Sequence, residues 1–117
     1  MRKEKINILI QSKGRMAADV EKIFKKNNLK ILKKKERSLI GYIKGYPNIN
    51  ILFMNTSEIC EALAKNVGDI GISGKDLWKE SEPSVQSKIS LAKEYSFGKS
   101  SLIVAVDRFW LDCVNSG

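Results

Sequence analysis

Apolar and polar positions along the chain predict strands and helices in alternation. Residues 6–10 are apolar except for Asn7, as in a strand that is buried in a parallel or mixed sheet. Apolar residues between Met16 and Phe24 then recur at spacings of three and four, with charged residues between them. This pattern predicts an amphipathic helix that ends near residues 27–28. A strand, a polar glycine turn and a helix therefore follow one another at the start of the chain.

The alternation continues to the end of the sequence. We expect strands over residues 29–32, 39–43, 49–54, 69–72 and 102–106. A longer helix should run from residues 56–58 to Gly68 and a short one over 77–80. We expect turns at 45–48 and 73–76, a loop at 81–86 and a glycine bend at 95–99, while residues 85–92 are ambiguous and could be extended. The order of elements indicates an α/β domain with a mixed, mostly parallel sheet.

Composition narrows the possible chemistry. The 117 residues suffice for one ordinary domain, and they include no histidine, which excludes catalytic triads and histidine zinc sites within this chain. The two cysteines, Cys60 and Cys113, suit reduced buried thiols in a cytosolic protein better than a disulfide scaffold. No apolar run approaches the length of a membrane helix, and the amino terminus does not resemble a signal peptide. We therefore expect a cytoplasmic protein without a membrane partner.

The net charge of +8 is unevenly distributed. Residues 1–50 carry 14 basic and 4 acidic side chains, whereas residues 51–117 carry 7 basic and 9 acidic ones. The first part should attract anions, either nucleic acid or phosphorylated small molecules. The basic run from Lys33 to Arg37 contains no aromatic residues for base stacking, so it suits a solvated hairpin tip better than a nucleic-acid patch.

Three polar turns should lie at the carboxyl ends of strands, where open α/β sheets bind ligands: residues 12–15, 55–58 and 73–76. Each leads into a helix, whose free N–H groups favour anions. Basic side chains and glycines at these turns could cradle a phosphate, namely Lys13, Gly14, Arg15, Gly74 and Lys75. Any one turn could equally be an ordinary helix start. Asp76 and Glu58 could orient a ribose hydroxyl or a metal ion, or simply favour the helix dipole.

Several segments together resemble the amino-terminal half of ATP phosphoribosyltransferase, the first enzyme of histidine biosynthesis, and its short-form catalytic subunits in particular. They are residues 12–15, Arg37 with its neighbours, 68–77, 97–99 with 102–106, and 110–112. Residues 68–77 are the most specific of these. The resemblance implies a lobe like those of type II periplasmic binding proteins, with residues 1–100 forming the first α/β lobe. Residues 101–117 would then form a crossing strand and the start of a second lobe that is largely absent.

The resemblance also implies an activity: N1 of ATP attacks C1 of phosphoribosyl pyrophosphate and releases pyrophosphate, with Mg²⁺ required. Short forms work with a histidyl-tRNA-synthetase-like regulatory subunit, and we expect a homo-oligomer. Arg37 and Arg15 would be catalytic, with Arg37 stabilising the departing pyrophosphate. The substrate-binding residues would be Lys13, Gly14, Arg15, Asn55, Ser57, Ser73, Gly74, Lys75 and Asp76, and no metal ligand is expected in this chain.

Departures from the family pattern suggest that this chain is catalytically incomplete. The DxxxTGxT loop with which the family binds phosphoribosyl pyrophosphate does not occur in these residues. Asn55 stands where relatives usually have arginine, and Cys60 where many have proline. A non-catalytic nucleotide-binding or regulatory module is therefore an alternative function. A basic nucleic-acid-binding domain is a third possibility, which only the charge suggests.

Overall fold

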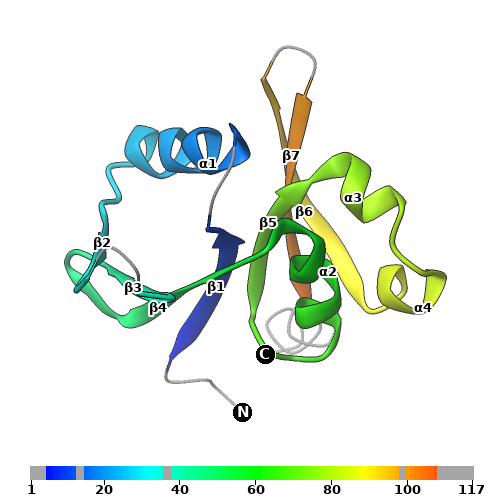
Figure 1. Ribbon diagram of the computed structural model, residues 1–117, viewed down its shortest axis with the longest axis horizontal. Helices are drawn as coiled ribbons and strands as arrows, with labels where there is room; N and C mark the ends of the chain where they lie inside the picture. The colour runs from blue at the N-terminus through cyan, green and yellow to red at the C-terminus, as the bar shows by residue number, and fades with distance from the viewer. Residues whose placement is uncertain (1–4, 13–14, 36–37, 98–99, 108–117) are drawn as a thin grey trace.

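The computed structural model describes residues 5–12, 15–35, 38–97 and 100–107 (Figure 1). Through the first two thirds of this part, strands and helices follow the order that the sequence predicts, with three strands in succession between the first two helices. The elements are β1 (Ile6–Gln11), α1 (Arg15–Lys26), β2 (Ile31–Lys33), β3 (Ile40–Ile43), β4 (Tyr46–Met54), α2 (Thr56–Ala64), β5 (Ile70–Gly74), α3 (Lys75–Lys79), α4 (Pro83–Gln86), β6 (Ile89–Phe97) and β7 (Ser100–Asp107).

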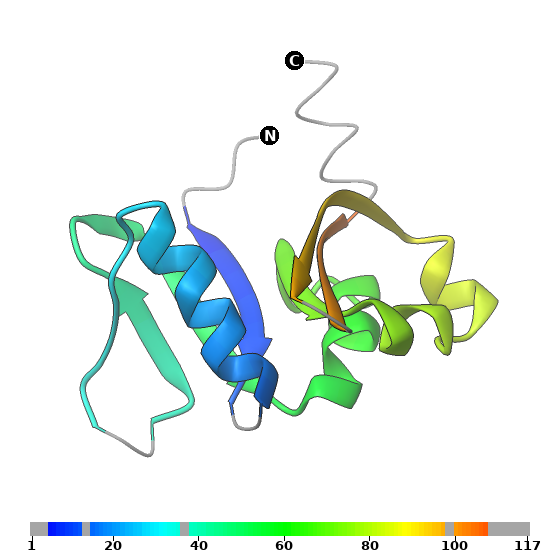
Figure 2. The same cartoon turned by 90° about the horizontal axis from the view of Figure 1, so that it is seen from above.

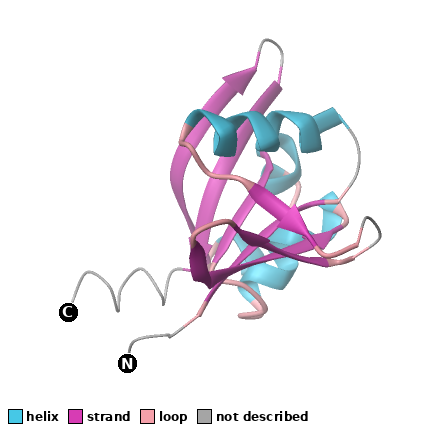
Figure 3. Cartoon of the chain, turned by 90° about the vertical axis from the view of Figure 1, so that its left-hand side faces the viewer, coloured by secondary structure: helices cyan, strands magenta, loops and turns pink. Residues whose placement is uncertain are grey.

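The strands form one sheet in the order β2-β3-β4-β1-β5-β7-β6. The mixed α/β sheet is confirmed, but its parallel part is limited to the central strands β4, β1 and β5. The outer pairings are antiparallel. Hairpin connections such as β3–β4 and β6–β7 are too short for the crossover that a parallel pair needs, so the sheet has more antiparallel pairs than expected. Figure 3 shows that the sheet is strongly twisted.

Helices cover the two faces of the sheet. Within β1, Ile8 and Ile10 belong to the core cluster on the α1 side, whereas Leu9 belongs to the cluster formed with α2. This alternation follows from the two-residue period of a strand, and it makes β1 the divider between the two layers of the core. Figure 2 shows β1 between α1 and the other helices. No helix among the described residues is long and apolar enough to span a membrane.

Asp69 fixes the start of β5 beside β1. It is 3% exposed, its Oδ2 accepts a hydrogen bond of 2.9 Å from the Asn7 N–H, and its own N–H donates to the Asn7 carbonyl at 2.9 Å. At the preceding position, a Cβ on Gly68 would lie 2.5 Å from Cγ of the buried Leu9. A larger residue than glycine therefore cannot fit there without displacing the core.

Several boundaries differ from the sequence predictions. The expected turn at 45–48 belongs mostly to β4, and α2 ends at Ala64 rather than at Gly68. The expected loop at 81–86 contains α4, where a proline occupies the first turn. β6 takes up residues 89–92 of the ambiguous segment and the described part of the expected bend at 95–99, and it extends to Phe97 because it pairs along its length with β7. β7 lies in the same sheet as the preceding strands. The division of the chain into two lobes at residue 100 remains a prediction.

Candidate functional site

The carboxyl ends of β1, β4 and β5 lie at one edge of the sheet because these three strands are parallel neighbours (Figure 1). The Ser12 N–H donates to the Met54 carbonyl at 3.0 Å and holds the end of β1 against the end of β4. A helix follows each of these strands, so the amino termini of α1, α2 and α3 are brought to this edge. The partial positive charge of helix amino termini makes the edge favourable for an anion.

The first predicted turn lies only partly within the described residues. Lys13, Gly14 and Arg37 are outside them, and Arg15 is the first residue of α1. The roles expected for Lys13, Gly14, Arg15 and Arg37 therefore remain predictions.

The second turn joins β4 to α2. Asn55 precedes the helix with extended backbone angles, φ −69° and ψ 141°, and its side-chain amide donates to Glu58 Oε1 at 3.1 Å. Asn55 and Ser57 are exposed, and the Asn55 side chain does not cap the helix. No side-chain cap thus covers the start of α2, where the Glu58 N–H donates to the Asn55 carbonyl at 2.9 Å and the Glu58 carboxylate is the acid of the first turn.

The third predicted turn is divided between a strand and a helix. Ser73 and Gly74 are the buried last residues of β5, whereas Lys75 and Asp76 begin α3. β5 continues through Gly74 because Gly74 pairs with Leu102 of β7. Ser73 is 3% exposed, and its hydroxyl makes no hydrogen bond of ordinary geometry to any described group. Asp76 is exposed.

Lys75 is held by an acidic residue that the sequence did not suggest. Its Nζ lies 2.9 Å from Oε1 of Glu94 on β6, and both side chains are partly exposed. The hydrogen bond from Lys75 lowers the pKa of Glu94. Because the segment around residues 85–92 was ambiguous, nothing in the sequence indicated that β6 would place a carboxylate beside α3. In this structure Lys75 is therefore paired rather than free to meet an anion.

Cys60 is a buried residue of α2 and belongs to the core cluster behind the third turn. It is 5% exposed, and burial raises the pKa of its thiol against the opposing effect of the nearby Ser81 and Ser73 hydroxyls. A buried thiol with a raised pKa is a poor nucleophile. The prediction of a reduced, buried Cys60 is confirmed, whereas Cys113 lies outside the described residues.

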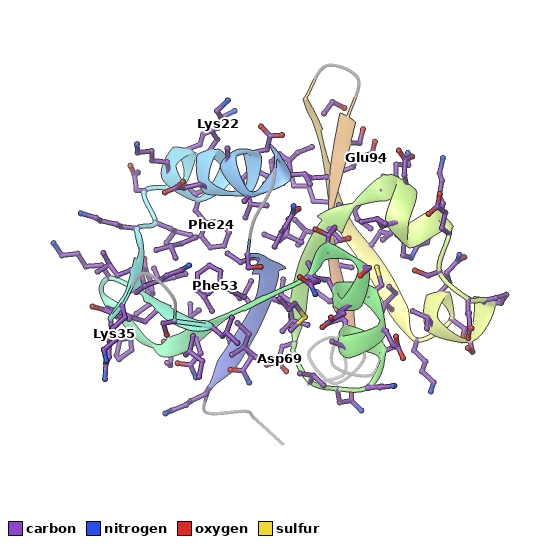
Figure 4. The ribbon with its side chains drawn as sticks, in the orientation of Figure 1. Lys22, Phe24, Lys35, Phe53, Asp69 and Glu94 are labelled. Carbon is purple, nitrogen blue, oxygen red and sulfur yellow. The ribbon has the colours of Figure 1, made fainter. Side chains whose placement is uncertain are left out.

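A hollow of about 280 Å³ lies beside this edge, between the start of α1 and the sheet. Its walls are formed by apolar side chains, and polar ones lie among them: Ile10, Gln11, Ser12, Ala17, Val20, Glu21, Ile31, Lys33 and Phe53. Figure 4 shows Phe53 and Phe24 directed toward each other from β4 and α1. We name this feature the α1 pocket. The sequence did not reveal it, because its walls come from four separate segments.

Lys33 is exposed at the end of β2, and it also lines the α1 pocket. Its Nζ lies 4.0 Å from the centroid of the Phe53 ring, a cation–π geometry, while Lys34 and Lys35 are exposed as predicted. Gly41 permits this arrangement, since a Cβ there would lie 2.9 Å from Cε2 of Phe53 and 2.8 Å from the Leu32 carbonyl oxygen. The bulky ring can therefore pack directly against β3.

The described residues contain no group of three or more histidine, cysteine, aspartate or glutamate side chains that could hold a metal ion. Trp78, expected as a core or interface residue, packs against the core cluster under α2. Its indole N–H is buried and has no hydrogen-bond partner among the described groups. Trp110 lies outside the described residues.

No protein-family model matches the chain. Curated ATP phosphoribosyltransferases do match it: those of Sinorhizobium fredii and Rhizobium etli are each 32% identical over 108 residues, and that of Rhodopseudomonas palustris is 33% identical over 106. These alignments cover 92%, 92% and 90% of the chain but 47%, 47% and 33% of the relatives. The chain thus spans half or less of the length of the curated relatives it matches.

A solved structure shares the fold. It is the "ATP phosphoribosyl transferase (HisG:HisZ) complex from Thermotoga maritima", with a TM-score of 0.56 and 20% identity, over 79% of this chain and 41% of that one. At this identity the likeness extends to the fold alone. The sequence matches and the shared fold agree, and the chain is similar to ATP phosphoribosyltransferases over half or less of their length.

Proposed function

We propose that the chain provides the first lobe of an ATP phosphoribosyltransferase, which transfers the phosphoribosyl group of phosphoribosyl pyrophosphate to N1 of ATP in the first step of histidine biosynthesis. The observation that carries this proposal beyond the sequence matches is the edge where β1, β4 and β5 end together and three helices begin. Helix amino termini gathered beside a basic segment suit substrates that both carry several phosphates.

The reaction suits a chain without histidine. A bond forms between N1 of ATP and C1 of the ribose, while the bond from C1 to the pyrophosphate oxygen breaks and its electron pair leaves with pyrophosphate. The nucleophile belongs to the substrate, so the protein has to position two anions and stabilise the negative charge of the leaving group. We assign phosphate binding to Lys13, Gly14 and Arg15, and stabilisation of the departing pyrophosphate to Arg37.

The other predicted residues would contact the nucleotide from the second and third turns. The exposed Asn55 and Ser57 stand at the start of α2, and Gly74, Lys75 and Asp76 lead into α3. We assign the buried hydroxyl of Ser73 a place behind them, where it can support the turn. Lys75 must exchange Glu94 for a phosphate when the nucleotide binds.

Mg²⁺ is expected with the substrates, whose polyphosphate charge it would neutralise. Among the described residues, no cluster of acidic side chains fits this ion, so we propose no protein ligand for it. The chain's own contribution is binding and orientation.

A regulatory subunit related to histidyl-tRNA synthetase is the proposed partner, and the solved neighbour is described as a HisG:HisZ complex. We also propose that the chain self-associates in the cytoplasm. Exposed apolar side chains around β3 support association, with Leu39 at 66% and Ile40 at 60%. Sedimentation over a range of protein concentrations would test this.

The first alternative is a nucleotide-binding or regulatory module without turnover. Pyrophosphate release should be measured with ATP and phosphoribosyl pyrophosphate, with the chain alone and with a regulatory subunit added. We expect the chain alone to bind ATP without turnover. Turnover by the chain alone would contradict its proposed incompleteness, and absence of ATP binding would contradict both functions.

A further inference from the structure

Two polar atoms lie buried behind the third turn without a hydrogen-bond partner among the described groups. One is the hydroxyl of Ser73, whose side chain is 3% exposed near the end of β5, and the other is the indole N–H of Trp78 in α3. Burying such a group without a partner is unfavourable, so native structures almost always supply one. The two atoms therefore indicate a bound group that completes their hydrogen bonds.

The neighbours of these atoms bring α2, β5 and α3 together (Figure 1). Trp78 packs against the core cluster that contains Cys60 of α2. The hydroxyls of Ser73 and Ser81 both lie close enough to the Cys60 thiol to oppose the rise in the pKa of that thiol. Ser81 directly follows α3, and its N–H donates to the Trp78 carbonyl at 3.1 Å. Cys60 thus faces both the end of β5 and the end of α3.

The chemistry of these groups selects the occupant. The indole N–H of Trp78 can only donate, whereas the Ser73 hydroxyl can donate and accept. The Ser81 hydroxyl already donates to the Leu77 carbonyl at 2.9 Å. A water molecule can accept from the indole and exchange a hydrogen bond with Ser73, and buried waters typically make about three hydrogen bonds. An anion would be buried beside an uncharged thiol, with no counter-charge among these groups.

We propose that one water molecule binds between Ser73 and Trp78 and joins the end of β5 to α3 behind the third turn. It accepts from the Trp78 indole, bonds to the Ser73 hydroxyl and lies beside the Cys60 thiol. A buried water of this kind is part of the structure. The bridge fixes the direction in which the chain leaves β5, and so the place where Lys75 begins α3. The site lies behind the turn, so it does not depend on the ligand of the proposed function.

A crystal structure of the 117-residue chain tests the occupant. We expect an ordered water within hydrogen-bond distance of both Ser73 Oγ and Trp78 Nε1. A protein group in this place, or no density beside the two atoms, would overturn the site. Crystals soaked in bromide separate water from an anion, because bromide scatters anomalously. A bromide peak between the two side chains would overturn the assignment to water.

The sign of the effect of Ser73→Ala on stability distinguishes a bridging water from an unpaired hydroxyl. Removing one partner leaves the water and Trp78 with too few hydrogen bonds, so the unfolding equilibrium constant in urea titrations should rise about fivefold to tenfold. Removing a hydroxyl that bonds to nothing would leave this constant unchanged or lower it. Either of those results would overturn the proposal. Ser84→Ala, at an exposed position of α4, is the matched control and should change the constant by less than about twofold.

A double-mutant cycle tests whether the two side chains share one ligand. Trp78→Phe removes the indole N–H, and the packing that the smaller ring loses cancels in the cycle. Once the water has lost Trp78, Ser73→Ala should raise the unfolding constant by less than about twofold, against fivefold to tenfold in the unaltered chain. Equal effects of Ser73→Ala in the two backgrounds would show that no ligand is shared.

Hydrogen exchange tests the link to α3. The Glu80 N–H donates to the Asp76 carbonyl at the end of α3, and the Ser87 N–H donates to the Pro83 carbonyl at the end of α4, both at 3.0 Å. Without the bridge α3 should open more often. The Glu80 amide should therefore exchange about fivefold to tenfold faster in Ser73→Ala, while the Ser87 amide changes by less than about twofold. Equal acceleration of the two amides would overturn the role of the water in holding α3.

Discussion

At the scale of single residues, the pairing of Lys75 with Glu94 decides how available this lysine is to an anion. The 2.9 Å contact must break before Lys75 can donate to a phosphate. Glu94→Gln removes the competing charge, so we expect inorganic triphosphate to bind about twofold to fivefold more tightly in calorimetry. Glu61→Gln removes a similar exposed carboxylate from α2 and serves as the control. Unchanged binding in Glu94→Gln would place Lys75 outside the anion site.

Cys60 should make stability depend on pH in the alkaline range. Burial raises the pKa of its thiol above the ordinary value of 9.0, so the unfolded chain loses this proton first as the pH rises. The folded state is therefore favoured below about pH 9.0, and this advantage declines as the pH increases above it. Urea unfolding from pH 7 to pH 10 should show a steeper loss of unfolding free energy in the unaltered chain than in Cys60→Ala. Parallel profiles would contradict this account.

At the scale of elements, the sequence located those whose partners are close in the chain. β1, α1, β3 and the core of β4 were predicted because their apolar periodicity is strong and local. The start of β6 was left ambiguous, and its end and the last residues of β5 were assigned to a bend and a turn, because their extended form depends on β7, whose pairing is not visible in local propensity. The α1 pocket was missed for the same reason, since its walls come from separate segments.

The connection from α2 to β5 gives a test at this scale. Residues 68–77 carried the strongest family resemblance, and two of them have structural roles: Asp69 binds the backbone of β1, and Gly68 lies against Leu9. Gly68→Ala would force a methyl group into this buried side chain, and we expect a loss of about 1–3 kcal/mol in urea unfolding. Val67→Ala alters the neighbouring exposed position and should cost much less. Equal losses in the two variants would show that the packing against Leu9 is not tight.

At the scale of the whole molecule, basic charge gathers on the side of the sheet formed by β2 and β3. Between Asn27 and Ser57 the chain carries one acidic residue, Glu36. The lysines of this stretch are exposed: Lys30, Lys33, Lys34, Lys35 and Lys44. Such a surface attracts any polyanion, so charge alone does not distinguish a nucleotide from a nucleic acid. The α1 pocket is of a size that suits a small group rather than a polymer.

Salt dependence should separate the two kinds of ligand. A duplex bound through exposed lysines releases counterions, so its affinity should fall steeply with salt and be lost by about 200 mM. AMP carries only one phosphate and contacts few cations, so its affinity should fall much less over the same range. The double variant Lys34→Glu with Lys35→Glu should abolish the residual DNA binding while changing AMP affinity by less than about threefold, since neither side chain lines the pocket. Titrations with fluorescent duplex and with AMP at 50 and 200 mM salt would measure both. Sequence-independent duplex binding that persists at the higher salt would favour the nucleic-acid function instead, because such binding could not rest on exposed lysines alone.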